Sequence, residues 1–267
     1  MERYRLKNII ILILLLVNVS LMSSLFYRQA EKHTMMQRTE DELISLFSAY
    51  DITLSPGTIS WKTPPGEISM SRSAELEQEL AAFLLGSDFR SAAQGGINIY
   101  SSASASLQTR TNGEFDAVFY HAPEDTGAFC KELCALLSCS APTFSLDEQG
   151  NGSASAVCQY ENQPIYNAAV TFTLENGLIT AVSGMLLPAD GISRTTGEEL
   201  SCPAALTAFL DMLLEEGTVG SSILNTYVCY ELQRTPASAI SLNSVWCIET
   251  DVSNYYVNSM TGTITVG

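Results

Sequence analysis

Cysteine is the most reactive residue type in this chain, and two cysteines have a spacing that could support chemistry. Cys130 and Cys134 lie four residues apart, so a helix would place both thiols on one face. Such a pair could bind a metal ion or react as a dithiol, but Leu133 and Leu137 would share that face. We therefore expect both cysteines to be small core residues.

The remaining cysteines show no recognisable metal or redox spacing. No C-x-x-C pattern occurs, which excludes a thioredoxin-like site and a zinc knuckle. The odd total leaves at least one cysteine unpaired within a monomer. The seven are Cys130, Cys134, Cys139, Cys158, Cys202, Cys229 and Cys247.

Other catalytic residue types are scarce. Only His33 and His121 are available for acid–base work, and no neighbour is placed to orient His121 for a hydrolase. The carboxylate pairs Glu198-Glu199 and Glu215-Glu216 fall at expected helix ends and are interpreted as solvated charge. Phosphate-binding, dinucleotide-binding, zinc-protease and nucleophile-elbow motifs do not occur. We therefore predict that the chain is not an enzyme and uses no catalytic residue, cofactor, metal ion or small-molecule substrate.

An uncharged apolar stretch, Asn8 to Tyr27, determines how the chain must be organised. A helix of this length crosses about 30 Å, the thickness of a bilayer's hydrocarbon core. The region Ser20 to Arg28 offers no A-x-A-like cleavage site, and no cysteine follows the stretch for lipoprotein processing. We therefore predict an uncleaved single span in the cell membrane.

The orientation of this span is not fixed by charge, because Lys and Arg flank both of its ends equally. A short basic tail before an apolar stretch has the form of an export signal. We therefore expect the N-terminus to be cytoplasmic and the bulk of the chain to be extracytoplasmic.

Asn18 and Ser20 are the candidate partner-binding residues, because both are polar and lie inside the predicted span. A single helix tolerates an amide at modest cost, so Asn18 could be neutral. Alternatively, its amide hydrogen-bonds a partner helix within the bilayer, an interaction of about 0.6–2 kcal/mol. Both interpretations stay open.

The chain after the span is strongly acidic. Residues 1–27 hold only three of the 13 Lys and Arg and one of the 29 Asp and Glu, so the remainder carries a net charge near −18. Such a surface repels nucleic acid and anionic headgroups. About 240 residues of mostly apolar and neutral composition suffice for a substantial core in one domain or two.

Hydrophobic periodicity predicts a repeated order of one helix followed by antiparallel strands. A juxtamembrane helix is expected over 28–50, and its apolar stripe is expected to pack on the body of the domain, with a partner helix as the alternative. The stripe consists of Met36, Leu43, Phe47 and Tyr50. Further helices are expected over 73–85, 124–137 and 201–217, with Ser73 and Ser201 as N-caps and Gly86 and Gly217 at the ends of the first and last. Asn112-Gly113 and Asn176-Gly177 are typical hairpin turns. The strands are expected at 97–101, 106–111, 114–120, 143–147, 153–160, 170–175, 178–187, 223–232, 244–249, 255–259 and 263–266.

This order predicts an α+β fold with helices packed on one face of each sheet. We expect four parts. They are residues 1–27 as basic tail and transmembrane helix, 28–56 as juxtamembrane helix, 57–122 as an N-terminal α+β subdomain, and 123–267 as a C-terminal α+β region of two similar units.

Four segments of the sequence carry a family resemblance. They are Gln159–Gly184 (QYENQPIYNAAVTFTLENGLITAVSG), Asn225–Leu232 (NTYVCYEL), Ser244–Thr250 (SVWCIET) and Tyr255–Ile264 (YYVNSMTGTI). With the basic tail, single span and following helix, they resemble the YycI family of two-component system regulatory proteins. Their features are also similar to PepSY-type modules, in which a helix covers a β-meander.

The resemblance implies function by binding, with no catalysis. YycI-like proteins are single-span extracytoplasmic proteins that bind a YycH-like sibling and the WalK (YycG) sensor histidine kinase. The implied contacts are made through the span and the outer domain and bias the signalling state of the kinase, while the sign of that effect stays open. The alternative is a PepSY-like extracytoplasmic module that restrains or chaperones a cell-envelope hydrolase.

Overall fold

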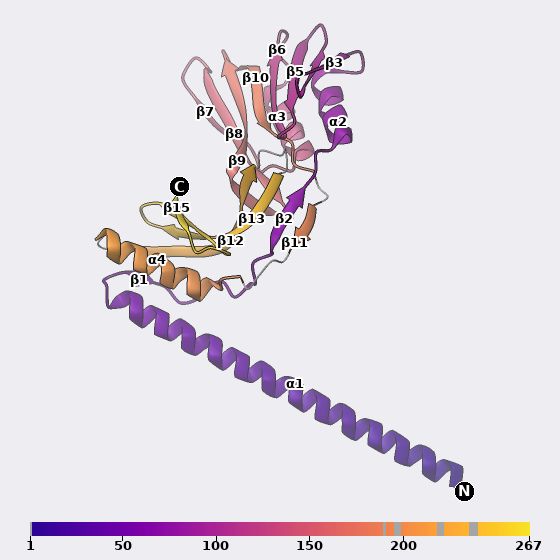
Figure 1. Ribbon diagram of the computed structural model, residues 1–267, viewed down its shortest axis with the longest axis vertical. Helices are drawn as coiled ribbons and strands as arrows, with labels where there is room; N and C mark the ends of the chain where they lie inside the picture. Colours follow the sequence, from indigo (N-terminus) through magenta and orange to yellow (C-terminus); the bar gives the residue numbers. More distant parts are fainter. Residues whose placement is uncertain (1, 189–190, 195–198, 218–221, 235–239) are drawn as a thin grey trace.

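The computed structural model describes residues 2–188, 191–194, 199–217, 222–234 and 240–267. Side chains of residues 2–16, 25, 193–194 and 216 lie outside the described part. The protein is α+β, as predicted, with a two-part sheet, helices against it and one long helix projecting from the body (Figure 1).

Helix α1 (Glu2–Ser48) is uninterrupted from the N-terminal tail to the body. At about 1.5 Å per residue it is about 70 Å long, and most of it projects away from the body in Figure 1. The helix expected from residue 28 onward is confirmed, and it ends two residues earlier than predicted. Only its last turns are covered, where Leu43 and Phe47 are buried.

Half of the predicted membrane span falls on undescribed side chains. Of residues 8–27, side chains 8–16 and 25 lie outside the described part. Within the part whose side chains are described, no helix combines the length and apolarity needed to cross a membrane.

The other helices begin and end where capping chemistry places them. Helix α2 (Ala74–Leu85) begins after Ser73, whose Oγ accepts a hydrogen bond from the Leu76 amide, and Gly86 ends it, as predicted. Helix α4 (Cys202–Glu216) follows the predicted cap at Ser201 and ends at Gly217, whose φ of 68° is the left-handed conformation that glycine adopts most easily.

Helix α3 (Thr126–Leu136) starts later than the predicted residue 124. The reason is that the Asp125 carboxylate accepts a hydrogen bond from the Ala128 amide at 2.9 Å, which makes Asp125 the cap.

The predicted strands are confirmed, most with small shifts at their ends, and four further strands appear. The additional four are short: β1 (Thr53–Leu54), β2 (Glu67–Met70), β3 (Arg90–Gln94) and β11 (Gly191–Arg194). The others are β4 (Ile97–Ser101), β5 (Ala105–Arg110), β6 (Glu114–Phe119), β7 (Thr143–Leu146), β8 (Gly152–Tyr160), β9 (Gln163–Glu175), β10 (Leu178–Met185), β12 (Ser222–Arg234), β13 (Ile240–Thr250), β14 (Asn254–Asn258) and β15 (Ile264–Val266). Three of the additional strands, β1, β2 and β11, pair with segments far away in the chain, whereas β3 forms a hairpin with β4. The largest differences from the prediction are β9, which begins seven residues before the predicted residue 170, and β13, which begins four residues before the predicted residue 244.

The turn between β5 and β6 differs in detail from the prediction. Of Asn112 and Gly113, only Gly113 has a positive φ, at 84°. The Asn112 side chain instead accepts a hydrogen bond from the Glu114 amide at 3.1 Å. At Asn176-Gly177 both residues have positive φ, as a two-residue hairpin turn requires.

The main path through the sheet runs β11-β2-β13-β12-β9-β10-β6-β5-β4-β3. Most neighbours are antiparallel, and the two parts of the sheet meet at a single parallel pairing between Tyr230 of β12 and Ile165 of β9. Helices α2 and α3 cover one face of the upper part, while α4 lies along the lower part (Figure 1).

The long hairpin β12–β13 connects two hydrophobic cores. Its base contributes Val228 and Trp246 to a lower core with α4 and the end of α1. Its outer end contributes Leu232 and Leu242 to an upper core with α2, α3 and strands β2, β4, β5, β6, β8, β9 and β10. The domain boundary expected after residue 122 stays a prediction, and the upper core extends across it.

Candidate functional site

The junction between α1 and the body is the first candidate site, because it connects the predicted membrane segment to the fold. Phe47 is fully buried and Leu43 is nearly so, packed in the lower core with α4 residues such as Leu206 and Phe209. The amphipathic stripe of the predicted juxtamembrane helix thus packs on the body, as the sequence favoured. The apolar burial fixes the direction in which α1 leaves the body.

Hydrogen bonds hold the chain directly after α1. The Ile52 amide donates to the Phe47 carbonyl, which closes the helix end. Strand β1 then pairs in parallel with β12 at Leu54 and Ile223. The Thr226 hydroxyl of β12 donates a hydrogen bond to the Thr58 carbonyl. The same hydroxyl oxygen accepts a hydrogen bond from the Ser60 amide. These contacts make α1, β1 and β12 one connected unit.

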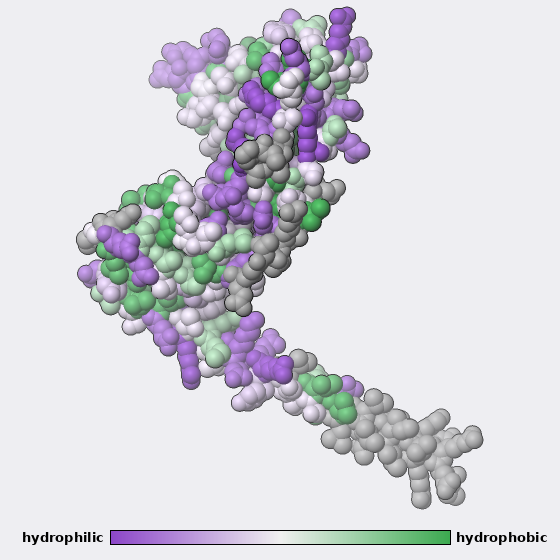
Figure 2. All heavy atoms as spheres, in the orientation of Figure 1, coloured by the Kyte–Doolittle hydropathy of each residue, from purple (hydrophilic) through white to green (hydrophobic). Residues whose placement is uncertain are grey.

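Asn18 and Ser20 lie exposed on α1, well beyond the junction. They are two residues apart and therefore on different faces of the helix, so one partner helix would contact only one of them directly. Apolar side chains surround them on the described part of α1, and all are exposed (Figure 2). These are Val17, Val19, Leu21, Met22 and Phe26.

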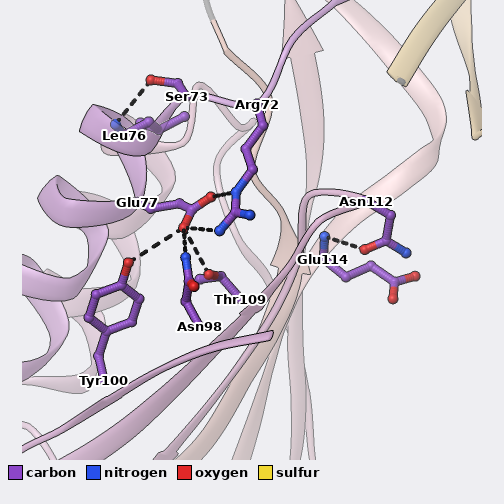
Figure 3. Close-up of polar contacts among 9 residues, drawn as sticks. All are labelled: Arg72, Ser73, Leu76, Glu77, Asn98, Tyr100, Thr109, Asn112 and Glu114. Atoms are coloured by element: carbon purple, nitrogen blue, oxygen red, sulfur yellow. Dashed lines mark hydrogen bonds and ion pairs between the residues drawn. The ribbon is translucent and has the colours of Figure 1, made fainter. Parts of the chain in front are cut away.

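A buried carboxylate, Glu77 on α2, is the strongest electrostatic feature of the upper core, and only 3% of its surface is exposed. Figure 3 shows donors converging on it from three directions. Arg72 Nε and Nη2 donate to its two oxygens, the latter at 2.7 Å. Asn98 Nδ2 and Thr109 Oγ1 donate at 3.0 Å each, and the Tyr100 hydroxyl lies at 3.5 Å.

These contacts keep Glu77 ionised. Burial raises the pKa of a carboxyl, but here the hydrogen bonds from Arg72, Asn98 and Thr109 outweigh burial and lower the pKa of Glu77. In return, the hydrogen bonds that Arg72 donates to Glu77 raise the pKa of Arg72. Because its oxygens are engaged by these donors, Glu77 is suited to fastening α2 onto β4 and β5 and not to proton transfer.

Sequence reasoning missed Glu77, although a signal was present. Leu80 and Leu84 follow Glu77 by three and seven residues, a spacing that places all three side chains on the same, apolar face of α2. The neighbours Glu75 and Glu79 lie off that face and are exposed. A charge within an apolar stripe predicts a buried ion pair, but the sequence does not identify Arg72 as its partner.

A second charged cluster joins the two parts of the sheet. Arg110 Nη1 lies 2.6 Å from Asp116 Oδ2 and 3.7 Å from Glu114 Oε2, and Arg234 of β12 contacts the same Glu114. The cluster lines a cavity of about 440 Å³. Two positive and two negative side chains leave no excess charge to attract an ionic ligand, and partly exposed ion pairs contribute little stability.

A groove on the lower sheet carries aromatic side chains. The rings of Tyr166 and Tyr256 stack with centroids 3.7 Å apart, and the Tyr166 hydroxyl donates to Glu231 at 3.1 Å. The groove is about 350 Å³ in volume, and Asn243 and Asn258 contribute amides to it. Tyrosines framed by polar groups are typical of protein interfaces. We call these five residues the tyrosine groove.

The residues first considered for chemistry are not assembled into an active site in the described part of the chain. His33 and His121 are exposed. Cys130 and Cys134 are buried core residues, as predicted, and burial raises the pKa of each thiol to about 11. Among the described residues, no cluster of three or more His, Cys, Asp and Glu side chains could hold a metal ion.

The interpretation of the paired glutamates as solvated charge needs one correction. Glu198 lies outside the described residues, but Glu199 is half-buried and burial raises its pKa. Its Oε2 is inaccessible, and within the described part of the chain no hydrogen-bond partner reaches it. Glu215 is exposed, as expected, and the side chain of Glu216 is not described.

Comparisons with known proteins identify no relative of known function. No protein family matches the sequence, and no curated protein does either. One similar solved structure is that of an uncharacterized protein from Eubacterium rectale ATCC 33656, with 12% sequence identity and a TM-score of 0.40. The alignment covers 81% of this chain and 83% of that one. A likeness at this level carries no argument about activity or partners.

Proposed function

We propose that this chain is a membrane-anchored extracytoplasmic regulatory protein that binds a sensor histidine kinase of the WalK (YycG) type, together with a YycH-like sibling. It spans the cell membrane once through residues 8–27, with the N-terminus in the cytoplasm and the bulk of the chain outside. It acts by binding and not by catalysis. Its strongly acidic body disfavours nucleic acid as a partner.

The observation that carries this proposal is the continuity of α1 from the apolar stretch into the lower core. Phe47 and Leu43 hold the helix end in the body, so the body turns when the span turns. A flexible tether would transmit no such orientation. The exposed apolar side chains from Val17 to Phe26 support a lipid or partner-helix environment for this part of α1.

The mechanism is a population shift. A partner that contacts one state of the kinase better than the other shifts the kinase by that difference in affinity and by no more. In this proposal Asn18 contacts a kinase helix within the bilayer, while the tyrosine groove contacts the sibling or the outer domain of the kinase. In this proposal the body consists of helix-plus-meander units of PepSY type, with domain boundaries after residues 56 and 122.

Crosslinking in native membranes tests the proposal. The tagged full-length protein is crosslinked, purified and its partners identified by mass spectrometry. We expect a histidine kinase, and we expect it to be lost when residues 8–27 are replaced by an unrelated span. Asn18→Leu should reduce its recovery, with Ser20→Leu as the matched control on another helix face.

The alternative from another class is a PepSY-like module that restrains or chaperones a cell-envelope hydrolase. It is favoured by the tyrosine groove, because that surface belongs to the body and needs no membrane contact. Recovery of envelope hydrolases alone, together with full activity of a soluble body beginning after residue 27, would establish this alternative and reject the kinase proposal.

A further inference from the structure

Two cysteines face one another across a short antiparallel pairing between the end of α3 and β8. Cys139 and Cys158 form an isolated bridge outside the main strand ladders, and their sulfur atoms lie 3.6 Å apart. Flanking backbone bonds run from the Ser140 amide to the Val157 carbonyl at 2.8 Å and from the Gln159 amide to the Ser138 carbonyl at 2.9 Å.

This bonding pattern places the two cysteines at a non-hydrogen-bonded pair. At such pairs the two Cα atoms approach to about 4.5 Å and the side chains are closest. A disulfide requires Cα atoms about 4.4–6.8 Å apart, so the backbone already has the separation that a bond needs. Closing it requires the two sulfur atoms to approach while the strands keep their pairing.

The pair is also accessible from one side. Cys139 is partly exposed and lines a cavity of about 400 Å³, whose wall continues along β8 to Tyr160 and reaches Pro188. Cys158 is fully buried behind it. A small disulfide reagent can therefore approach the sulfur of Cys139 but not that of Cys158.

We propose that Cys139 and Cys158 form an intramolecular disulfide when the protein meets a small-molecule disulfide such as oxidised glutathione. The hydrogen bond to Cys158 and burial raise the pKa of Cys139, so the reaction uses its small thiolate fraction and is expected to be faster at alkaline pH. That Cys139 thiolate attacks one glutathione sulfur, which breaks the glutathione disulfide and releases one reduced glutathione. The Cys158 thiolate then attacks the Cys139 sulfur and displaces the second glutathione. The two cysteines are oxidised, one glutathione disulfide is reduced, and the two cysteine protons pass to the two departing thiolates.

The other cysteines lack this combination of position and access. Cys134 lines the same cavity, but its side chain is buried on α3 and it is not part of the strand pairing. Cys229 and Cys247 share a small apolar cluster with tyrosine side chains, and their thiols hydrogen-bond each other. Their backbone positions are diagonal neighbours, because Cys229 lies opposite Val245 and Cys247 lies opposite Tyr227. Diagonal Cα atoms are about 7–8 Å apart, beyond ordinary disulfide reach. Both thiols are also buried. This pair is therefore the internal control.

The bond would staple the end of α3 to the upper sheet. Residues 139–158 enclose the hairpin of β7 and β8, so the crosslink closes a loop of moderate length. Closing such a loop restricts the unfolded chain, and for a protein of this size we expect the melting temperature to rise by about 5–10 °C. The inference concerns the body alone and does not depend on the proposed partner.

The test exposes the folded full-length protein to oxidised glutathione and then maps its cysteines by alkylation and mass spectrometry. The expected product is a peptide pair linked through Cys139 and Cys158, with the remaining cysteines still reduced. Cys158→Ser should accumulate a glutathione adduct on Cys139. Cys139→Ser should gain no adduct on Cys158, and Cys229→Ser should still form the bond.

Several results would overturn the proposal. They are a linkage through Cys134 or between Cys229 and Cys247, a stable glutathione adduct on Cys139 in the unmodified sequence, or no linked peptide at all from folded protein. A linked protein with an unchanged melting temperature would reject the stapling role. Because each serine variant replaces a thiol by a similar small group, a melting curve of each reduced variant verifies that it remains folded.

Discussion

Replacing Glu77 by glutamine removes a negative charge from the upper core while keeping the size of the side chain. The Arg72 guanidinium would then face a neutral amide, and the amide nitrogen would meet the donors of Asn98 and Thr109. Breaking a buried ion pair by removing one partner costs about 3–5 kcal/mol. Because 32% of the Arg72 side chain is exposed and can be hydrated, we expect the lower end, about 3 kcal/mol.

The effect of this substitution depends on pH in a defined direction. The pKa of Glu77 in the folded protein lies below its ordinary value of 4.5. Its charge therefore stabilises the fold fully above pH 4.5, and this contribution is lost as the pH falls through the lower folded-state pKa. The stability difference between the original sequence and Glu77→Gln should be full at neutral pH and shrink under strongly acidic conditions.

Denaturant unfolding at several pH values measures this prediction, with Glu79→Gln as the matched control on the exposed side of α2. We expect about 3 kcal/mol for Glu77→Gln at neutral pH and under about 0.5 kcal/mol for the control. A double-mutant cycle with Arg72→Met should give a coupling of about 1–3 kcal/mol. Equal effects of the two glutamine substitutions, or a difference that does not change with pH, would refute the reasoning.

Three further changes probe the junction, a turn and the surface charges. Phe47→Ala should destabilise the protein by about 3–5 kcal/mol in urea unfolding, whereas Leu46→Ala on the exposed face should cost under about 1 kcal/mol; similar costs would contradict the buried junction. Gly113 and Gly57 both have positive φ, but only at Gly113 would an added Cβ meet another atom, the Ile240 Cδ1, at 2.8 Å. Gly113→Ala should therefore lower the melting temperature more than Gly57→Ala, and the reverse order would argue against the close contact. Arg234→Met should change unfolding stability by less than about 1 kcal/mol, and a larger loss would show that its partly exposed ion pair is stronger than its geometry indicates.

Local signals in the sequence were sufficient for the helices and hairpins. Ser73 and Ser201 provide caps whose side-chain oxygens accept helix amides, and Asn176-Gly177 supplies the two positive φ values of a tight turn. Such features depend on a few consecutive residues, so their chemistry is visible without the fold.

Features that depend on distant pairing could not be predicted. Strand β1 has only two residues and exists because it pairs with β12, far away in the chain. The hairpin β12–β13 was expected as two strands, but nothing local shows that its ends enter different cores. The opposition of Cys139 and Cys158 likewise arises from the pairing of α3's end with β8.

The candidate site was predicted only in part. The helix after the span and its packing on the body followed from periodicity, since Leu43 and Phe47 lie on one stripe. The stacking of Tyr166 on Tyr256 required two strands that are about ninety residues apart to meet, and no local pattern in the sequence shows that these two rings come together.

The central claim is that α1 transmits orientation between the membrane and the body. Alanine insertions between His33 and Thr34 test this directly. Seven inserted residues add about two helical turns, so the span and the body keep nearly the same orientation about the helix axis. Five inserted residues add a similar length but rotate the span relative to the body by about 140° about that axis. Signalling output of the co-purified kinase, measured as phosphorylation of its response regulator in cells, should stay normal with seven alanines and change with five. Equal output from both insertions would contradict the account.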